Sequence, residues 1–585
     1  MAALLAACSG SSSSPPEPDI AWHDCDPEAV SEEYINQLGE RLKCATLAVP
    51  LDHDDPRGAT IELGLSRVAA GDPSRRRNAI FVNPGGPGAD GLSLGAELGA
   101  LFALADPSDP LGAKLRRISD EYDVIGFSPR GLGSSTHLTC ELDAQFHVTL
   151  LASTAFTPEN LNAIHENKLL EARACRANPL TPYINTDAVV RDIDFVREKL
   201  GDEKVSYIGY SYGTWLGLWY ASRFPERVDR MMLDSVVNYT LPSFYAEGDD
   251  QAVPLQFILD ELVSPYAAAL DPIFGLGSSP DEIRGIFGEL PVELQTVLSS
   301  KLYGLLFSQK AADDTVVQLG AAKGVGEVLH AHPDAPREEL EARVAERRYA
   351  PDDEVDEVMR EAASELLDGT LELKSGERDP VELDPESAVN KAVVCNDGPS
   401  PTDPEFWIRE VEAIRDTAPV FARIANCTDE WGGPSVAKPD VEGARRVPNI
   451  LFVQNQYDGA TPLDGALKTR DLLGNVSLVY QTRDYTHGVF PSQEVCIDDP
   501  VAEFFAADEI PDRYVVECEG KGLLDGLPSA AAGALPETLR AQAVRGASGD
   551  ASSAYLDPDV ARTLAQRIHD QIRSAAAAAR GADAR

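Results

Sequence analysis

The sequence predicts an α/β fold, in which a mostly parallel β-sheet carries helices on both faces and a helical domain interrupts the chain. Two observations predict it. Apolar runs of strand length alternate with amphipathic helical patterns on both sides of the chain's middle. Between them, residues 241–446 form a helical, charged and proline-punctuated stretch with no clear strand. The chain has 585 residues, enough for a large core and an inserted domain.

The elements before the insertion follow from local patterns. Apolar runs predict a strand at 61–68, strand-and-loop units at 79–91 and 122–135, and a strand at 230–234. "KVSYIGYSYGTWLGLWYASRFP" has the pattern of a strand, a turn and a helix. Residues 186–201 form a predicted helix, which Thr186 is expected to cap and Gly201 to end. The apolar residues that share one face of this helix are Val189, Ile193, Val196 and Leu200.

The strand-and-loop pattern returns after the insertion, in "NILFVQNQYDGATP" (449–462) and "SLVYQTRDYTHG" (477–488). A Gly/Ala-rich linker then leads to a tail helix with an apolar residue every four positions, at Val560, Leu564, Ile568 and Ile572. The predicted organisation is a signal remnant and tether (1–21), a core in two parts (22–240 and 447–520), a helical cap (241–446), and a linker with a C-terminal helical extension (521–585).

Composition excludes some partners. The 96 acidic residues outnumber the 51 Lys and Arg, which gives a net charge of −45. Such a surface repels nucleic acid phosphates and anionic lipid headgroups, so no nucleic acid partner is expected. The simplest explanation of the acidic surface is solubility, and the alternative is a preference for basic ligands.

The first residues resemble the end of a bacterial lipoprotein signal. An apolar run ends in Leu5-Ala6-Ala7-Cys8, and a Ser/Pro-rich stretch follows that would serve as a flexible tether. The run is short and lacks a basic region before it, so either the true start lies upstream or this stretch is not a signal, and we favour a truncated signal. Lipidation at Cys8 would be the only membrane attachment, since no later segment is long and apolar enough to span a bilayer. We therefore expect an extracytoplasmic protein, secreted or anchored in the cell envelope.

Eight cysteines remain after Cys8. Their even number and the lack of any CxxC pair favour disulfides over a zinc site, and no metal or cofactor is expected. The simplest pairing joins neighbours in sequence: Cys25–Cys44, Cys140–Cys175, Cys395–Cys427 and Cys496–Cys518. Spacing alone does not fix this pairing, and buried free thiols are the alternative. His330 and His332 lack supporting ligands and are expected to be solvated loop residues.

The stretch "IGYSYGTWLG" carries the strongest chemical signal. Ser211 lies between glycines at i−2 and i+2, after a strand and before a helix, as a nucleophile elbow requires. A second Gly-x-Ser-x-Gly, around Ser93, has no strand leading into it. The glycines are explained by a turn too tight for side chains beside the serine. We therefore interpret Ser211 as the nucleophile.

A nucleophilic serine needs a base and an orienting acid, which in this architecture follow it in the order acid, then histidine. Asp458 follows one late strand and His487 follows the next. The only other histidine downstream is His569, in the tail helix. Asp458 and His487 are therefore the candidate acid and base.

The candidate oxyanion donors are the backbone amides of Gly86 and Tyr212. The loop "NPGGPG" follows an early strand, and its glycines can bring the backbone close, whereas Pro87 has no N–H to donate. Tyr212 directly follows the nucleophile. An ordinary turn is the alternative reading of the loop.

The motifs "VNPGGPGADG", "DVIGFSPRGLGSS", "YIGYSYGTWLGLWYASRFP", "VVCNDG" and "QYDGATP…THG", with paired cysteines, resemble the secreted tripeptidyl aminopeptidases. These belong to the proline iminopeptidase-like branch of the α/β-hydrolase fold. The resemblance covers about 22–518 and implies an exopeptidase that acts on peptides with free amino termini, under a helical cap. Two features depart from the family pattern: Ser128 replaces the acid usual before "PRG", and the extension after Cys518 is additional.

An exopeptidase must also hold the substrate's ammonium group, which calls for a carboxylate in the cleft. Asp397 is the candidate, because it lies two residues after Cys395 and the resemblance includes this Cys-x-Asp stretch. The alternative is that Asp397 caps a turn. For the whole chain, two further functions stay open: a small-molecule esterase or amidase with the same three residues, and a non-enzymatic surface lipoprotein that keeps the fold.

Overall fold

The computed structural model describes residues 20–244, 251–424, 427–509, 512–525, 527 and 558–581, with side chains of the last helix at 563–574. The predicted signal remnant, including Cys8, lies outside these residues. Within the described parts, no helix combines the length and apolarity needed to cross a bilayer.

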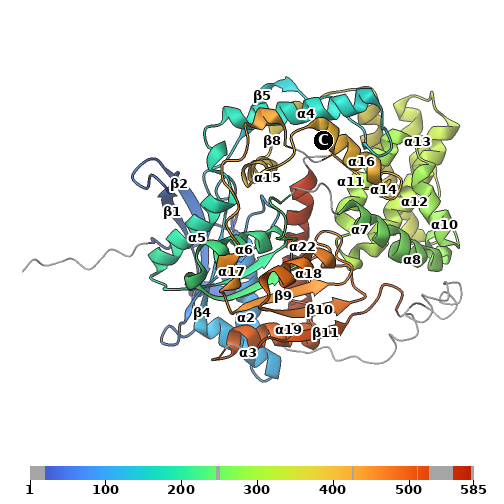
Figure 1. Ribbon diagram of the computed structural model, residues 1–585. Coiled ribbons are helices and arrows are strands. Elements are labelled where there is room, and N and C mark those ends of the chain that lie inside the picture. Colours follow the sequence, from blue (N-terminus) through green and yellow to red (C-terminus); the bar gives the residue numbers. More distant parts are fainter. Residues whose placement is uncertain are drawn as a thin grey trace, which may run out of the picture.

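A nine-stranded sheet forms the centre of the molecule (Figure 1). Its first two strands pair antiparallel to their neighbours, and all later neighbours are parallel. The strands, in their order across the sheet, are β1 (Leu42–Pro50), β2 (Thr60–Val68), β4 (Tyr122–Phe127), β3 (Asn78–Asn83), β6 (Val205–Tyr210), β7 (Val228–Asp234), β9 (Ile450–Asn455), β10 (Val476–Thr482) and β11 (Val515–Glu519). Every strand predicted from the sequence is present, and the predicted mostly parallel α/β sheet is confirmed.

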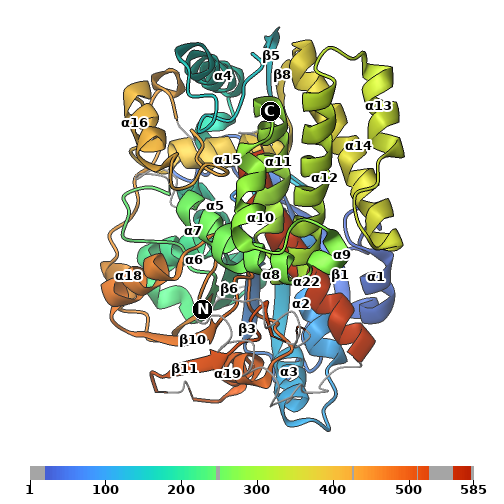
Figure 2. The ribbon, with the colours of Figure 1, turned by 90° about the vertical axis from the view of Figure 1, so that its right-hand side faces the viewer.

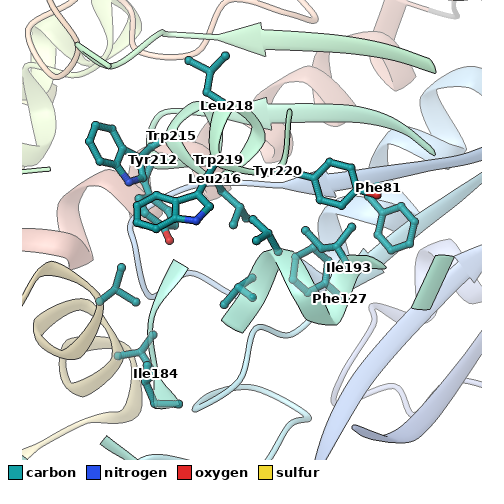
Figure 3. Packing of buried hydrophobic residues seen from close by; sticks show 14 of the residues in the cluster. Phe81, Phe127, Ile184, Ile193, Tyr212, Trp215, Leu216, Leu218, Trp219 and Tyr220 are labelled. Atoms are coloured by element: carbon teal, nitrogen blue, oxygen red, sulfur yellow. The ribbon is translucent and has the colours of Figure 1, made fainter. Parts of the chain in front are cut away.

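Helices cover both faces of the sheet, so β3, β4, β6 and β9 are buried along their whole length. Successive side chains of β3 point to opposite faces: Phe81 packs in one apolar cluster, and Ile80 and Val82 in the other. Figure 3 shows the first cluster, in which Phe81 and Phe127 lie near Tyr220 and Ile193, and Trp215 and Trp219 lie together on the other side. The helices of this face are α5 (Thr186–Leu200), α6 (Tyr212–Arg223), α17 (Glu442–Arg445) and α18 (Leu463–Leu473). Those of the other face are α1 (Glu32–Leu38), α2 (Leu92–Leu104), α3 (Pro110–Glu121) and α19 (Val495–Ala506).

The predicted helix at 186–201 is α5, and Gly201 ends it in the left-handed conformation, with φ +77°. The capping residue at the amino end of α5 differs from the prediction. Asn185 is the N-cap residue and accepts a hydrogen bond from the amide of Ala188, whereas Thr186 is already in the first turn. The amide of Thr186 is instead bonded to Asp397.

The insertion between β7 and β9 is helical, as predicted, and has its own apolar cluster. Its helices are α7 (Ala252–Phe257), a π-helical turn (Ile258–Val263), α8 (Ser264–Ala269), α9 (Asp271–Phe274), α10 (Pro280–Gly288), α11 (Val292–Leu305), α12 (Ala312–Ala331), α13 (Arg337–Glu346), α14 (Asp353–Ser375), α15 (Pro385–Asn396) and α16 (Pro404–Ile414). We refer to this insertion as the cap.

The insertion differs from the sequence interpretation in two respects: its last helix, α17, packs on the core helix α6, and it contains a strand. β8 (Pro380–Leu383) pairs antiparallel with β5 (Cys140–Gln145), which comes from the first part of the chain. The helix α4 (Pro158–Ala177) packs on both strands. Figure 1 shows β5, β8 and α4 together, away from the main sheet. The segment from β5 to α4, which the predicted boundaries assign to the core, therefore packs with the cap.

All four predicted disulfides are present: Cys25–Cys44, Cys140–Cys175, Cys395–Cys427 and Cys496–Cys518. Each pair joins cysteines that are neighbours in the sequence. Four disulfides in one chain are typical of proteins from oxidising compartments.

The predicted tail helix is α22 (Pro558–Gly581). It packs against α2 of the core and against α11 and α15 of the cap. Figures 1 and 2 show it passing through the middle of the molecule, between the sheet and the cap helices. The predicted apolar positions Leu564, Ile568 and Ile572 are buried. The side chain of Val560 lies outside the described residues.

Candidate active site

Ser211 lies in a sharp turn between β6 and α6. Its φ of +54° is in the left-handed region, which is costly for a residue with a side chain and is typical of a nucleophile elbow. The flanking glycines are sterically required. A Cβ on Gly209 would lie 2.5 Å from the carbonyl oxygen of Gly213, and one on Gly213 would lie 2.8 Å from that of Asn83. The elbow context predicted from the sequence is therefore present.

Asp458 and His487 come together at the carboxyl ends of β9 and β10. Nδ1 of His487 lies 3.0 Å and 2.9 Å from the two carboxylate oxygens of Asp458. The Asp458 carboxylate also accepts hydrogen bonds from the amides of Ala460 and Thr461 and from the Thr461 hydroxyl. These donors fix the carboxylate in an orientation that holds the imidazole.

The imidazole of His487 is fully buried. Because the Asp458 carboxylate is an acceptor, we assign the ring proton to Nδ1, which leaves Nε2 as a proton acceptor. Nε2 has no hydrogen-bond partner among the described residues. The amide of His487 donates to the carbonyl of Phe307, a cap residue, at 2.8 Å, and the two rings lie 5.7 Å apart. The histidine is therefore positioned by both the core and the cap.

Asp234, at the end of β7, links the serine turn to the histidine loop. Its backbone carbonyl accepts a hydrogen bond from the Ser211 amide at 3.0 Å. Its carboxylate accepts from the amides of Val489 at 2.9 Å and Phe490 at 2.7 Å. Burial raises the pKa of Asp234 to about 7. Sequence reasoning placed Asp234 only in a strand; an acid at the carboxyl end of a buried strand was the available signal.

The loop predicted to supply an oxyanion donor lies against the serine turn. A Cβ on Gly85, whose φ is +107°, would lie 2.6 Å from the carbonyl oxygen of Tyr210 and 2.8 Å from Cβ of Ser211. Only glycine allows this close approach. The amides of Gly86 and Tyr212 donate to no acceptor among the described residues, since no hydrogen bond from either is found there. Both remain the candidate oxyanion donors, and Tyr212 opens the amino end of α6.

Asp397 is fully buried, and its carboxylate accepts hydrogen bonds from the amide of Thr186, at 2.7 Å, and from the Thr186 hydroxyl. That hydroxyl also contacts the phenol of Tyr212 at 2.5 Å. Burial raises the pKa of Asp397 to about 7. This arrangement supports the capping alternative: Asp397 caps the first turn of α5 rather than a local turn, and through Thr186 it positions the Tyr212 side chain.

The other singled-out residues lie apart from these contacts. Ser93 is in the first turn of α2 and donates to the carbonyl of Ala29 at 3.2 Å. Ser128, at the position of the expected acid, donates to the carboxylate of Asp90 at 2.8 Å. His330 is exposed in the last turn of α12, which is a helix rather than the expected loop. Among the described residues, no group of three acidic, Cys or His side chains is placed to bind a metal.

Comparison with known proteins identifies two matching families. The family described as "alpha/beta hydrolase fold" matches residues 78–321, which include Ser211. The family described as "TAP-like protein" matches residues 417–518, which include Asp458 and His487. The confirmed features are the α/β-hydrolase fold and the similarity to tripeptidyl aminopeptidases expected from the sequence motifs.

Three relatives illustrate the range of named activities. A tripeptidyl aminopeptidase from Streptomyces coelicolor is 27% identical over 496 residues, which are 82% of this chain and 83% of that protein. Serine protease Hip1 from Mycobacterium tuberculosis is 27% identical over 84% of this chain and 89% of its own. Carboxylesterase B from Mycobacterium tuberculosis is 25% identical over the same shares.

Proposed function

We propose that this chain, an α/β hydrolase related to the tripeptidyl aminopeptidases, is a serine exopeptidase that releases amino acids or short peptides from free amino termini. The observation that carries the proposal is the contact between Asp458 and His487, on a loop that Asp234 joins to the strained serine turn. This set of groups supports acyl transfer, because it combines a nucleophile, a base with a free nitrogen and an acid that orients the base.

In the proposed reaction, Oγ of Ser211 attacks the carbonyl carbon of the scissile peptide bond while Nε2 of His487 takes its proton. The amides of Gly86 and Tyr212 stabilise the negative charge on the carbonyl oxygen. His487 then gives the proton to the leaving amine, and an acyl-enzyme forms on Ser211. Water, activated by the same nitrogen, releases the acyl group and restores the serine.

The preference for an exopeptidase is supported by two comparisons. The "TAP-like protein" family matches the part of the chain that holds Asp458 and His487, and two relatives are named tripeptidyl aminopeptidases. The cap contacts the site loops through Phe307, which binds the amide of His487, and through Asn390 of α15, which donates to the carbonyl of Pro87 at 3.0 Å. We therefore expect the cap to select substrates. A small-molecule esterase is the second candidate, because one relative is named a carboxylesterase.

A labelling experiment tests the nucleophile. A fluorophosphonate probe should modify wild-type protein at Ser211, and the Ser211→Ala variant should remain unlabelled. A panel of aminoacyl-, prolyl- and tripeptidyl-aminomethylcoumarin substrates, each with a free and an acetylated amino terminus, then tests the exopeptidase assignment. Turnover of the free forms alone supports it. Turnover of short-chain p-nitrophenyl esters alone would favour the esterase.

We further propose that the protein is exported. The four disulfides support an oxidising compartment, and the sequence around Cys8 supports a lipid anchor. Mass spectrometry of the amino-terminal peptide from the cell envelope would detect a diacylglyceryl group on Cys8, or its absence.

A further inference from the structure

The C-terminal helix α22 lies beside the proposed active site. It packs against α2 of the core and against α11 and α15 of the cap, and thus lies between the two parts (Figures 1 and 2). Ligand sites occur preferentially at the interfaces between domains. This helix belongs to the extension that the family resemblance does not cover.

Polar contacts attach α22 to both loops of the site. Nε2 of Gln571 donates to the carbonyl of Asp90 at 2.9 Å, two residues after the glycine loop that holds Gly86. A ring nitrogen of His569 lies 2.9 Å from the carbonyl of Pro491, four residues after His487. Nearer the amino end of the helix, Arg567 forms an ion pair with Glu33 of α1 at 2.7 Å.

The apolar face of α22 fills the space next to the proposed base. Ile568 and Ile572 are fully buried, in the same apolar cluster as Val489 and Phe490. A Cβ on Gly488, the residue after His487, would lie 3.2 Å from two carbon atoms of Ile572. The helix is therefore in contact with the histidine loop itself.

The space beside α22 extends beyond the helix. A cavity of about 680 Å³ lies next to the histidine loop, where its wall includes Gly488 and Val489. The α22 side chains that line it are Gln566, His569, Asp570 and Arg573. The helix thus forms one wall of a cavity that reaches the histidine loop, while Ser211 itself lies outside the cavity wall and is only 5% exposed.

We propose that the groove filled by α22 is the binding groove for the substrate peptide, and that α22 competes with substrate for it. The inference rests on the proposed function, since it requires Ser211 to act on peptides. Aliphatic side chains occupy the groove next to His487, so it suits peptides with aliphatic residues near the scissile bond. Because α22 is tethered to the same chain, its local concentration is high, and substrate must displace it.

Two matched variants of the full chain test the competition. Ile572→Asp places a charge in the apolar contact, which displaces α22, whereas Ser574→Asp adds the same charge at an exposed position two residues away. We expect Ile572→Asp to raise the rate of fluorophosphonate labelling and kcat/KM for a free tripeptidyl substrate by about tenfold or more, because the competent fraction rises. Ser574→Asp should match wild type. A synthetic peptide of residues 558–581 should inhibit the Ile572→Asp variant competitively.

Other outcomes are distinguishable. If Ile572→Asp keeps the wild-type labelling rate and Tm, α22 does not compete. If it lowers Tm and activity together, α22 is a structural wall of the site. If the probe labels Ser211 in neither protein, the proposed function itself fails.

A measurement on wild-type protein covers the case in which the variant does not fold. Hydrogen–deuterium exchange of residues 563–574 is compared before and after Ser211 reacts with a tripeptidyl phosphonate diphenyl ester. Displacement of α22 by the bound peptide should raise exchange in this segment. Unchanged exchange, with Ser211 fully modified, would overturn the inference.

Discussion

The backbone carbonyl of Asp234 accepts a hydrogen bond from the amide of Ser211 at 3.0 Å. The carboxylate of the same residue holds the amides of Val489 and Phe490, two and three residues after His487. One residue thus fixes the serine turn with its main chain and the histidine loop with its side chain. Relative placement of a nucleophile and its base depends on such links, and an error of about 1 Å can cost 100-fold in rate.

Asp234→Asn should lower kcat by about tenfold to 100-fold, with little change in KM. The side chain of the new asparagine would point its NH2 group at one of the two backbone N–H donors, so one of the two hydrogen bonds to the histidine loop would be lost. Asp229→Asn, on the same strand, is the control, because its carboxylate accepts a hydrogen bond from Asn78 and, among the described residues, none from a residue of the site. Steady-state kinetics and fluorophosphonate labelling measure the effect. Equal kcat values for Asp234→Asn and wild type would show that the link is dispensable.

Ser211→Ala should reduce turnover by a factor of thousands or more, on the scale seen when catalytic triads lose a member. Ser93→Ala should keep most activity, because Ser93 contacts Ala29 in α2 and lies outside the strained turn. Turnover by the two variants is compared after confirming that both have the same Tm. Similar losses in both would contradict the assignment of the nucleophile.

Asp397→Asn distinguishes two roles. An ammonium anchor would raise KM for peptides with a free amino terminus and spare a neutral ester. The contacts with Thr186, and through it with Tyr212, lead us to expect that peptide and ester turnover change together. Parallel kinetics on a tripeptidyl substrate and p-nitrophenyl acetate decide the matter, and a selective effect on the peptide would restore the anchor.

The pH dependence of stability gives an independent test of Asp397. Burial raises its pKa to about 7 in the folded protein, above the value of about 3.9 in an unfolded chain. Its favourable contribution is therefore complete below pH 4 and is lost as pH rises through about 7. Wild type should lose more of its Tm than Asp397→Asn between pH 5 and 8. Asp234 is unchanged in both proteins, so its own titration cancels, and a constant Tm difference would contradict the prediction.

Removing the Cys395–Cys427 disulfide should destabilise the cap. The two cysteines are 32 residues apart, and a cross-link of this span contributes about 3–4 kcal/mol on the chain-entropy account. Urea unfolding of the Cys395→Ser/Cys427→Ser double variant measures the loss. Peptide mapping without reductant checks all four pairs, and free thiols in protein from the envelope would contradict them.

The strands and the serine turn were predictable because their signals are local. "KVSYIGYSYG" contains its own apolar run, its tight turn and the start of its helix within ten residues. Asp458 and His487 followed from their order along the chain and from the strands before them. These signals do not depend on the rest of the fold.

The features that escaped prediction depend on distant partners. The strand β5, with sequence "CELDAQ", has one buried residue, Cys140, and otherwise alternates between exposed and half-buried positions. Its partner β8 lies more than 200 residues later. Thr186 and Asn185 are both good capping residues, and the contact of Thr186 with Asp397 accompanies the choice of Asn185. The role of Asp234 likewise required the histidine loop, 253 or more residues away in sequence, to be placed beside it.

The order of the disulfides has a consequence for biosynthesis. The eight described cysteines pair strictly in sequence, first with second, third with fourth and so on. A chain that enters an oxidising compartment from its amino terminus exposes each cysteine together with its correct partner before the next pair arrives. Successive oxidation of neighbours then yields the native set directly, without the slow reshuffling that interleaved pairs require. The connectivity thus suits a protein that reaches its compartment as an unfolded thread.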